Sequence, residues 1–231
     1  MNASPKDRNL AQLFAVSAKL TPLLDQIVFV GGCVTGLLLT DVAAAQVRPT
    51  LDVDAIIEIA SYSEFAMLET KLLHLGFRRE ATLICRWIQE DLILDLMPTD
   101  PSILGFSNRW YSPALKHSHP VRMGQHEIRV ITAPYFLATK LEAFHARGKD
   151  DFRMSHDLED IVTVIDGRPE LVQEISQSPQ DLRSYLVEQF RSLLVNTSFR
   201  DALPWHLLPD AASQQRITIV VNRIQKIIDL A

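Results

Sequence analysis

Three aspartates lie in apolar stretches of the sequence that are typical of β-strands. Asp52 and Asp54 stand two residues apart in the run 51–59, and Asp95 lies in the middle of the run 92–97. Residues two apart on a strand project from the same face, so Asp52 and Asp54 are expected side by side. Such carboxylates repel each other unless a cation compensates for their charge, and Mg²⁺ or Mn²⁺ prefers oxygen ligands. The spacing predicts a metal site at Asp52, Asp54 and Asp95; the alternative is a sheet edge whose acids face water.

A glycine pair precedes these acids in the chain. Gly31 and Gly32 follow the short β-type run 27–30 and come before the stretch 34–45, which is predicted as a helix. A turn between a strand and a helix exposes backbone N–H groups, and the helix dipole adds partial positive charge. The pattern therefore predicts a phosphate site at Gly31 and Gly32.

Two cations and two acids stand in the helical second half. Lys140 and Arg147 are seven residues apart, so they lie within about 20° of each other on one helix face. Asp157 and Asp160 share a face of the next predicted helix. We predict that Lys140 and Arg147 bind the oxygens of a triphosphate and that Asp157 or Asp160 orients one of them. The alternatives are a solvated basic face and acids that act as helix-dipole partners.

A locally basic stretch covers residues 101–132. It contains one acid, Glu127, against four cations, for a local charge of +3: Arg109, Lys116, Arg122 and Arg129. Aromatic rings beside a cation, as in the run 105–111, suit contact with a base or an RNA acceptor. The alternative is that these rings anchor a long loop on the core.

The elements that must position these residues form two groups. Residues 1–132 combine an opening helix, strands near 27–30 and 51–59, a helix over 63–75, and hairpins about residues 90–91 and 124. Residues 133–231 carry helical patterns throughout, with the last helix over 212–230. The predicted fold class is α/β (α+β): a mixed-sheet domain at 1–132, followed by a helical domain at 133–231 that completes the active-site cleft.

The composition excludes several classes of protein. The chain has 231 residues, of which 47% are hydrophobic and 22% charged, and a net charge of −5, which excludes a disordered chain and a globally basic nucleic-acid binder. Its two cysteines, Cys33 and Cys85, are far apart, so neither a disulfide framework nor a zinc-finger spacing is present. We find no signal-peptide pattern and no membrane-spanning run, and predict a cytoplasmic protein without a membrane partner.

Four motifs together are more specific than any one of them. They are Val30-Gly31-Gly32 with the leucines at 37–39, Thr50-Leu51-Asp52-Val53-Asp54, Lys140-x-x-Ala143-x-x-x-Arg147, and Asp157-x-x-Asp160-Ile161. This combination resembles the polymerase-β-type nucleotidyltransferase superfamily, and within it the AbiEii-like toxins of type IV toxin–antitoxin systems. The run 29–41 is also similar to the turn of tRNA CCA-adding enzymes, but Thr35 and Gly36 replace its Arg-Asp.

The resemblance implies an enzyme that moves a nucleoside monophosphate from a nucleoside triphosphate (NTP), such as ATP, to a hydroxyl group of a macromolecule, with pyrophosphate leaving. Two Mg²⁺ ions at the three aspartates would clamp the triphosphate, with Asp95 as the base. The glycine turn would seat the phosphates, and Lys140 and Arg147 would neutralise the leaving pyrophosphate.

The resemblance also implies partners. The expected acceptor is RNA, particularly a tRNA 3′ end, with a protein acceptor as the next choice, and a toxin would have a cognate antitoxin. The alternative is a catalytically idle module that keeps the fold and binds a nucleotide or an antitoxin.

Overall fold

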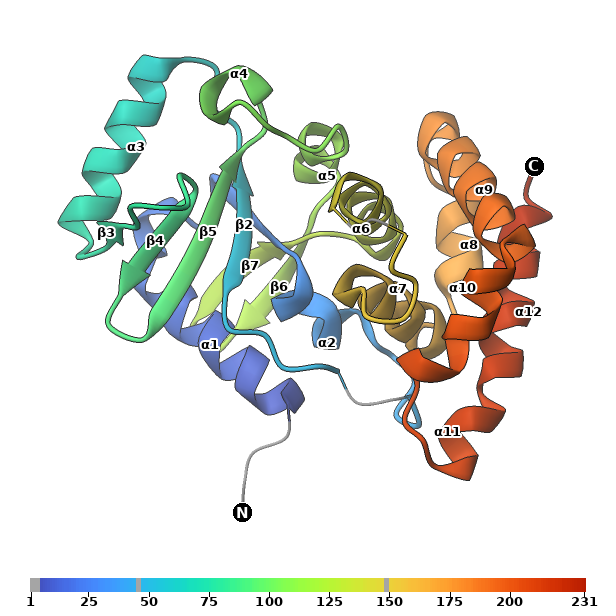
Figure 1. The fold of residues 1–231 in the computed structure, drawn as a ribbon. Coiled ribbons are helices and arrows are strands. Elements are labelled where there is room, and N and C mark those ends of the chain that lie inside the picture. The colour runs from blue at the N-terminus through green and yellow to red at the C-terminus, as the bar shows by residue number, and fades with distance from the viewer. Residues whose placement is uncertain (1–4, 45–46, 148–149) are drawn as a thin grey trace. The chain divides into compact units, whose positions relative to one another are not determined.

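The computed structural model describes residues 5–44, 47–147 and 150–231 (Figure 1). The chain forms two compact units, one of Met1–Gly36 with Arg48–Thr132 and the other of Leu37–Val47 with Ala133–Ala231. The division after Thr132 falls where the sequence pattern changes from mixed to helical. The segment Leu37–Val47 is grouped with the helices of the second unit.

The first unit contains a seven-stranded mixed sheet, which confirms the predicted α/β fold class. The strand order is β3-β4-β5-β2-β1-β7-β6. Strand β2 is antiparallel to β1 and parallel to β5, and β1 is parallel to β7. The strands are β1 (Ile27–Val30), β2 (Val53–Ile57), β3 (Arg78–Arg79), β4 (Arg86–Gln89), β5 (Leu92–Pro98), β6 (His119–Met123) and β7 (His126–Val130).

Strands β1 and β2 lie at the centre of this order. Their apolar residues suit strands that are covered by other parts of the protein on both faces of the sheet. All four residues of β1 are buried, as are four of the five in β2, and Asp54 is the half-buried exception. Such continuous apolar runs are typical of strands packed on both sides. The two predicted hairpins are confirmed, and their turns contain Glu90 and Gly124, both with positive φ.

Helices pack around the sheet of the first unit. Helix α1 (Pro5–Lys19) contacts β5, β2 and β7, and a 3₁₀ turn, η1 (Thr21–Leu23), follows it (Figure 1). Helix α3 (Tyr62–His74) begins after Ser61, whose hydroxyl accepts a hydrogen bond from the Glu64 N–H at 3.2 Å. Two short helices that we did not predict interrupt the following stretch, α4 (Pro101–Leu104) and α5 (Tyr111–Lys116).

The predicted helix over 34–45 is wrong for most of its length. A 3₁₀ turn, η2 (Gly32–Val34), leads into α2 (Thr35–Leu38), and no helix covers residues 39–44, while residue 45 lies outside the described residues. The N–H groups of Thr40 and Asp41 donate to the Gly167 carbonyl at 2.9 and 3.0 Å. The carbonyl of Leu38 accepts from Arg168 at 2.6 Å. These tertiary hydrogen bonds replace the helical ones.

The second unit is helical throughout its described part. The helical pattern predicted for residues 133–231 is confirmed, but the helix predicted over 212–230 is divided at Arg216, and α10 and a 3₁₀ turn, η3, were not predicted. The elements are α6 (Ala133–Arg147), α7 (His156–Gly167), α8 (Leu171–Ser176), α9 (Gln180–Val195), α10 (Thr197–Ala202), η3 (Leu203–His206), α11 (Ala211–Gln215) and α12 (Ile217–Ile228). Among the described residues, none of the helices is long and apolar enough to span a membrane.

Candidate active site

The three aspartates meet at one end of the central strands. In the parallel pair β2 and β5, Asp54 is the register partner of Asp95, so their side chains lie next to each other on one face. Asp52 stands directly before β2. Val30, the last residue of β1, is the register partner of Asp54, which brings the glycine turn to the same place. The structure therefore brings together all five residues that we predicted for this part of the site.

Gly31 packs closely against the Asp54 side chain. A Cβ atom at Gly31 would stand 2.0 Å from Oδ2 of Asp54. The backbone of Gly31 also has φ 68° and ψ −167°, a region that is essentially restricted to glycine. Glycine is thus required here both by the backbone conformation and by the carboxylate. Gly32, the next residue, is buried and begins η2.

Arg86 joins two of the aspartates, and our sequence analysis did not select it. Its Nε donates to Oδ1 of Asp95, and its Nη2 donates to Oδ2 of Asp95 and Oδ2 of Asp52, all at 2.7 Å. Arg86 begins β4 and is the register partner of Asp95 across the hairpin. Counting back from the hairpin turn at residues 90–91 would have placed the two residues opposite each other, so the sequence did contain a signal for this pair.

A further layer holds Asp52 in place. The Thr50 hydroxyl donates to Oδ1 of Asp52 at 2.8 Å. The Thr50 N–H donates to the side-chain oxygen of Asn9 at 3.0 Å, and the Asn9 amide donates to the Arg48 carbonyl at 2.9 Å. Asn9 belongs to α1 and is buried. Helix α1 therefore fixes the chain just before β2, and no local pattern in the sequence indicates this role.

The oxygen donors suit Mg²⁺ chemically, but their arrangement holds a guanidinium instead. Both oxygens of Asp95 and one of Asp52 accept hydrogen bonds from Arg86. Within the described parts of the chain, no group of three His, Cys, Asp or Glu side chains is arranged to hold a metal ion. As they stand, the residues do not fit a divalent cation, and a proton-accepting role for Asp95 would require the guanidinium to move.

The charges of this cluster affect the side chains within it. The hydrogen bond to Asp95 raises the pKa of Arg86 above its ordinary value, so this cation stays charged. Burial, followed by the negative charge of Asp95, raises the pKa of the neighbouring Cys85 thiol to about 11. Cys85 is therefore protonated at neutral pH and is suited neither to nucleophilic attack nor to metal binding.

The four charged residues predicted for the second half form one ion cluster between α6 and α7. Nζ of Lys140 lies 3.1 Å from Oδ1 of Asp157 and 2.6 Å from Oδ2 of Asp160. Nε and Nη2 of Arg147 donate to Asp157 at 3.1 and 3.0 Å. The Lys140, Asp157 and Asp160 side chains are 8%, 7% and 1% exposed, whereas Arg147 is 71% exposed. Both aspartates therefore contact Lys140, and Asp157 binds both cations.

Asp157 is ionised in this cluster. Burial raises the pKa of its carboxyl group, but Lys140 and Arg147 together lower it by more, so the pKa lies below its ordinary value of 3.8. This pairing gives Lys140 and Arg147 partners inside the second unit. Their predicted contact with a triphosphate stays a prediction.

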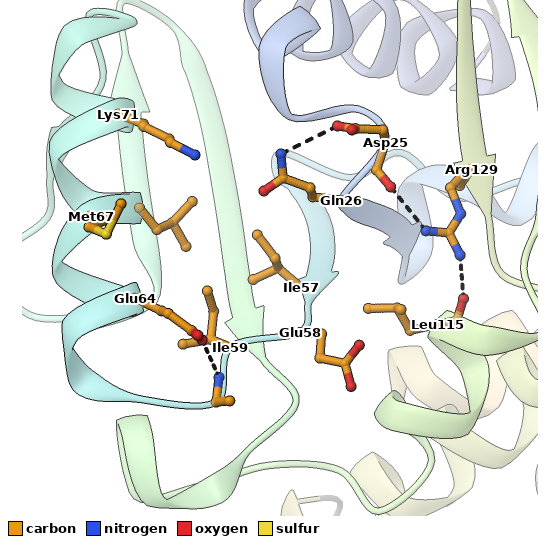
Figure 2. Close-up of a pocket in the computed structure, with 12 residues that line it drawn as sticks. Asp25, Gln26, Ile57, Glu58, Ile59, Glu64, Met67, Lys71, Leu115 and Arg129 are labelled. Carbon is orange, nitrogen blue, oxygen red and sulfur yellow. Dashed lines mark hydrogen bonds between the residues drawn. The ribbon is translucent and has the colours of Figure 1, made fainter.

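The basic stretch 101–132 is partly turned toward the protein. Arg129 donates to Oγ of Ser118 at 3.0 Å and to the carbonyls of Asp25 and Leu115 at 3.2 and 2.6 Å, as Figure 2 shows for the two carbonyls. The guanidinium of Arg109 lies 5.1 Å from the centre of the Trp110 ring, and this ring is buried. Trp110 thus packs on the core, whereas Phe106 of the same run is exposed, and the predicted contact with a base or an RNA acceptor stays a prediction.

A pocket of about 490 Å³ opens at the far end of the same strands (Figure 2). It is lined by residues before β1, residues 57–60 at the end of β2, one side of α3, and Leu115 with Arg129. Ile27 is the register partner of Ile57, and Val30 of Asp54. The pocket therefore lies at the opposite end of β2 from Asp54 and does not include the acidic cluster.

No protein-family model matches the chain, and no curated protein matches it. The chain is similar to the crystal structure of an antigenic nucleotidyltransferase-like protein from Paracoccidioides brasiliensis, with 19% identity, a TM-score of 0.49, and coverage of 85% of this chain and 92% of that one. It is also similar to a candidate nucleotidyltransferase from H. pylori, with 13% identity, a TM-score of 0.47, and coverage of 95% and 94%.

Proposed function

We propose that this chain is a nucleotidyltransferase that moves a nucleoside monophosphate from an NTP to a hydroxyl group of a macromolecule. The observation that carries the proposal is the assembly at one end of β1 and β2, where Asp54 lies against Gly31 and next to Asp95. A turn without side chains beside a group of carboxylates suits a substrate whose phosphates must come close to the backbone and whose acceptor must lose a proton. The four motifs of the sequence support the same activity.

In this proposal each residue has a defined task. The phosphates bind at the turn of Gly31 and Gly32 through its backbone N–H groups. Asp54 lies against this turn, so we assign to it the proton of the attacking hydroxyl. The hydroxyl oxygen forms a bond to the α-phosphorus, the bond from this phosphorus to the bridging oxygen breaks, and pyrophosphate leaves.

The metal and the second unit enter only as predictions. Mg²⁺ or Mn²⁺ at Asp52, Asp54 and Asp95 would supply positive charge for the phosphates, and the steps above use the chain's own residues alone. Lys140 and Arg147 are proposed to neutralise charge on pyrophosphate, with Asp157 and Asp160 holding Lys140.

The acceptor and the biological role rest on the motif resemblance. We propose RNA, particularly a tRNA 3′ end, as the acceptor, with a protein as the next choice and ATP among the candidate donors. A toxin role with a cognate antitoxin, and a cytoplasmic location, belong to the same proposal.

One observation favours a second function. Because Arg86 occupies oxygens of both Asp52 and Asp95, the chain also suits a catalytically idle module that binds a nucleotide or an antitoxin. Such a module would bind an NTP without transferring any part of it.

The substitution Asp54→Asn tests the proposal. Incubation with α-labelled NTPs, Mg²⁺ and bulk RNA or protein should label an acceptor with the wild-type chain. The variant should transfer at least about 100-fold less label to the acceptor, because an amide oxygen is a poor proton acceptor. Its melting temperature should stay close to that of wild type. Equal labelling by both proteins would remove Asp54 from the mechanism, and nucleotide binding without labelling by either would favour the idle module.

A further inference from the structure

Arg86 occupies the position between Asp52 and Asp95 that a cation would need. It donates three hydrogen bonds of 2.7 Å, two to Asp95 in a bidentate pair and one to Asp52. The oxygens that a divalent ion would bind are therefore already satisfied. A guanidinium carries one positive charge where a metal ion would carry two, so Arg86 balances only one of the two negative charges of Asp52 and Asp95.

The surroundings of Arg86 offer its guanidinium a further partner. The side chain is 22% exposed, so part of it reaches solvent. A third carboxylate, that of Glu80, lies 3.8 Å from Nε of Arg86. Glu80 is 28% exposed and pairs with Arg86 through the backbone as well, its N–H donating to the Arg86 carbonyl. The guanidinium therefore has a partner outside the aspartate cluster to which it can turn.

We propose that Arg86 is a built-in cation that excludes a divalent ion from Asp52 and Asp95 until a nucleotide draws the guanidinium away. The phosphates of an NTP carry more negative charge than the two carboxylates and match the fork of an arginine equally well. Arg86 would then move from the carboxylates to the phosphates. The second step rests on the proposed function, whereas the exclusion of the ion does not.

Binding of Mn²⁺ alone tests the exclusion step. We expect Arg86→Gln to bind Mn²⁺ about tenfold more tightly than wild type, as measured from the free-ion EPR signal, because the aspartate oxygens lose their competitor. Arg79→Gln is the matched control: Arg79 belongs to the neighbouring β3 and pairs with Glu69 at 3.0 Å. Its Mn²⁺ affinity should equal that of wild type. Affinities of Arg86→Gln and wild type within about twofold of each other would overturn the proposal.

A second measurement keeps the proposal testable if Arg86→Gln does not fold. In wild-type protein, the ¹⁵N resonance of the Arg86 Nε–H group reports its hydrogen bond to Asp95, and the loss of this signal in Arg86→Lys assigns it. Mg²⁺ alone at millimolar concentration should leave the resonance in place, whereas Mg²⁺ with a non-hydrolysable NTP analogue should shift it. A shift of this resonance with Mg²⁺ alone would contradict the proposal. So would the absence of a shift with Mg²⁺ and the NTP analogue together.

The two proposals fail separately. Tighter Mn²⁺ binding by Arg86→Gln in a chain that never labels an acceptor would support the exclusion by Arg86 and reject nucleotidyl transfer. Transfer by wild type with unchanged Mn²⁺ affinity in Arg86→Gln would support the proposed function and reject the exclusion.

Discussion

Single atoms decide the geometry of the acidic cluster. Oδ2 of Asp54 occupies the space that a Cβ at Gly31 would take, and the guanidinium of Arg86 joins Asp52 to Asp95. The first contact makes glycine obligatory, and the second decides which cation the aspartates hold. The contacts of Gly31 with Asp54 and of Arg86 with Asp52 join residues distant in sequence, whereas the pairing of Arg86 with Asp95 is set by the β4–β5 hairpin.

Gly31→Ala should reduce the free energy of unfolding by about 3 kcal/mol or more, because it adds backbone strain to a steric clash with Asp54. Gly105→Ala is the matched control: Gly105 also has positive φ, 78°, but a Cβ there would meet no atom within 4 Å. Gly105→Ala should reduce the free energy of unfolding by about 1 kcal/mol. Urea denaturation of both variants checks the prediction. Equal losses would show that the contact with Asp54 does not matter.

At the scale of elements, ion pairs link α6 to α7. Lys140 on α6 binds Asp157 and Asp160 on α7, and Arg147 at the end of α6 binds Asp157 again. Breaking a buried pair costs more than an exposed one because it leaves a charge without compensation. The spacing of these residues in the sequence is thus explained at least in part by helix packing.

The stability of this helix pair should depend on pH below about 5. The pKa of Asp157 is lowered in the folded state, so its ionised form favours folding. This contribution is complete above its ordinary pKa of 3.8 and is lost as the pH falls through the lower, folded-state value. Asp157→Asn should lose about 2 kcal/mol of unfolding free energy at pH 7 and show a shallower decline with acid.

The exposed Glu188 on α9 offers a control for this comparison. Glu188→Gln should follow the wild-type profile in urea denaturation at pH 7, 5 and 3. If Asp157→Asn and wild type declined in parallel below pH 5, the ion cluster would not stabilise the fold through Asp157.

The sequence predicted most elements and the meeting of the acids, because alternating and helical patterns are local. The hairpins about residues 90–91 and 124 and the convergence of Asp54 with Asp95 followed from such patterns. Asn9 was missed because its role comes from a tertiary partner, whereas the pairing of Arg86 with Asp95 follows from the hairpin register and only its contact with Asp52 is tertiary. The helix expected over 34–45 failed for the same reason, since its backbone groups bond to the end of α7.

At the scale of the whole molecule, the chain passes three times between its two units, after Gly36, Val47 and Thr132. Asp41 is tied to the second unit by a partly buried ion-pair network: Arg216 donates to Asp166 at 2.8 Å and to Asp41 at 2.6 Å. The Asp166 side chain is fully buried. Each unit therefore contains an arginine that bridges a pair of aspartates, and the pair in the first unit lies near the turn at Gly31.

The central claim is that the bond broken in the NTP is the one between the α- and β-phosphates. The most direct measurement gives the wild-type chain Mg²⁺, acceptor and the same NTP labelled either at the α- or at the γ-phosphate. Nucleotidyl transfer predicts that only the α-label enters the acceptor and that the γ-label is released in pyrophosphate. With Asp54→Asn, neither labelling of the acceptor nor release of labelled pyrophosphate should exceed background. Entry of the γ-label into the acceptor, or release of the γ-label as single phosphate with no labelled acceptor, would contradict the account.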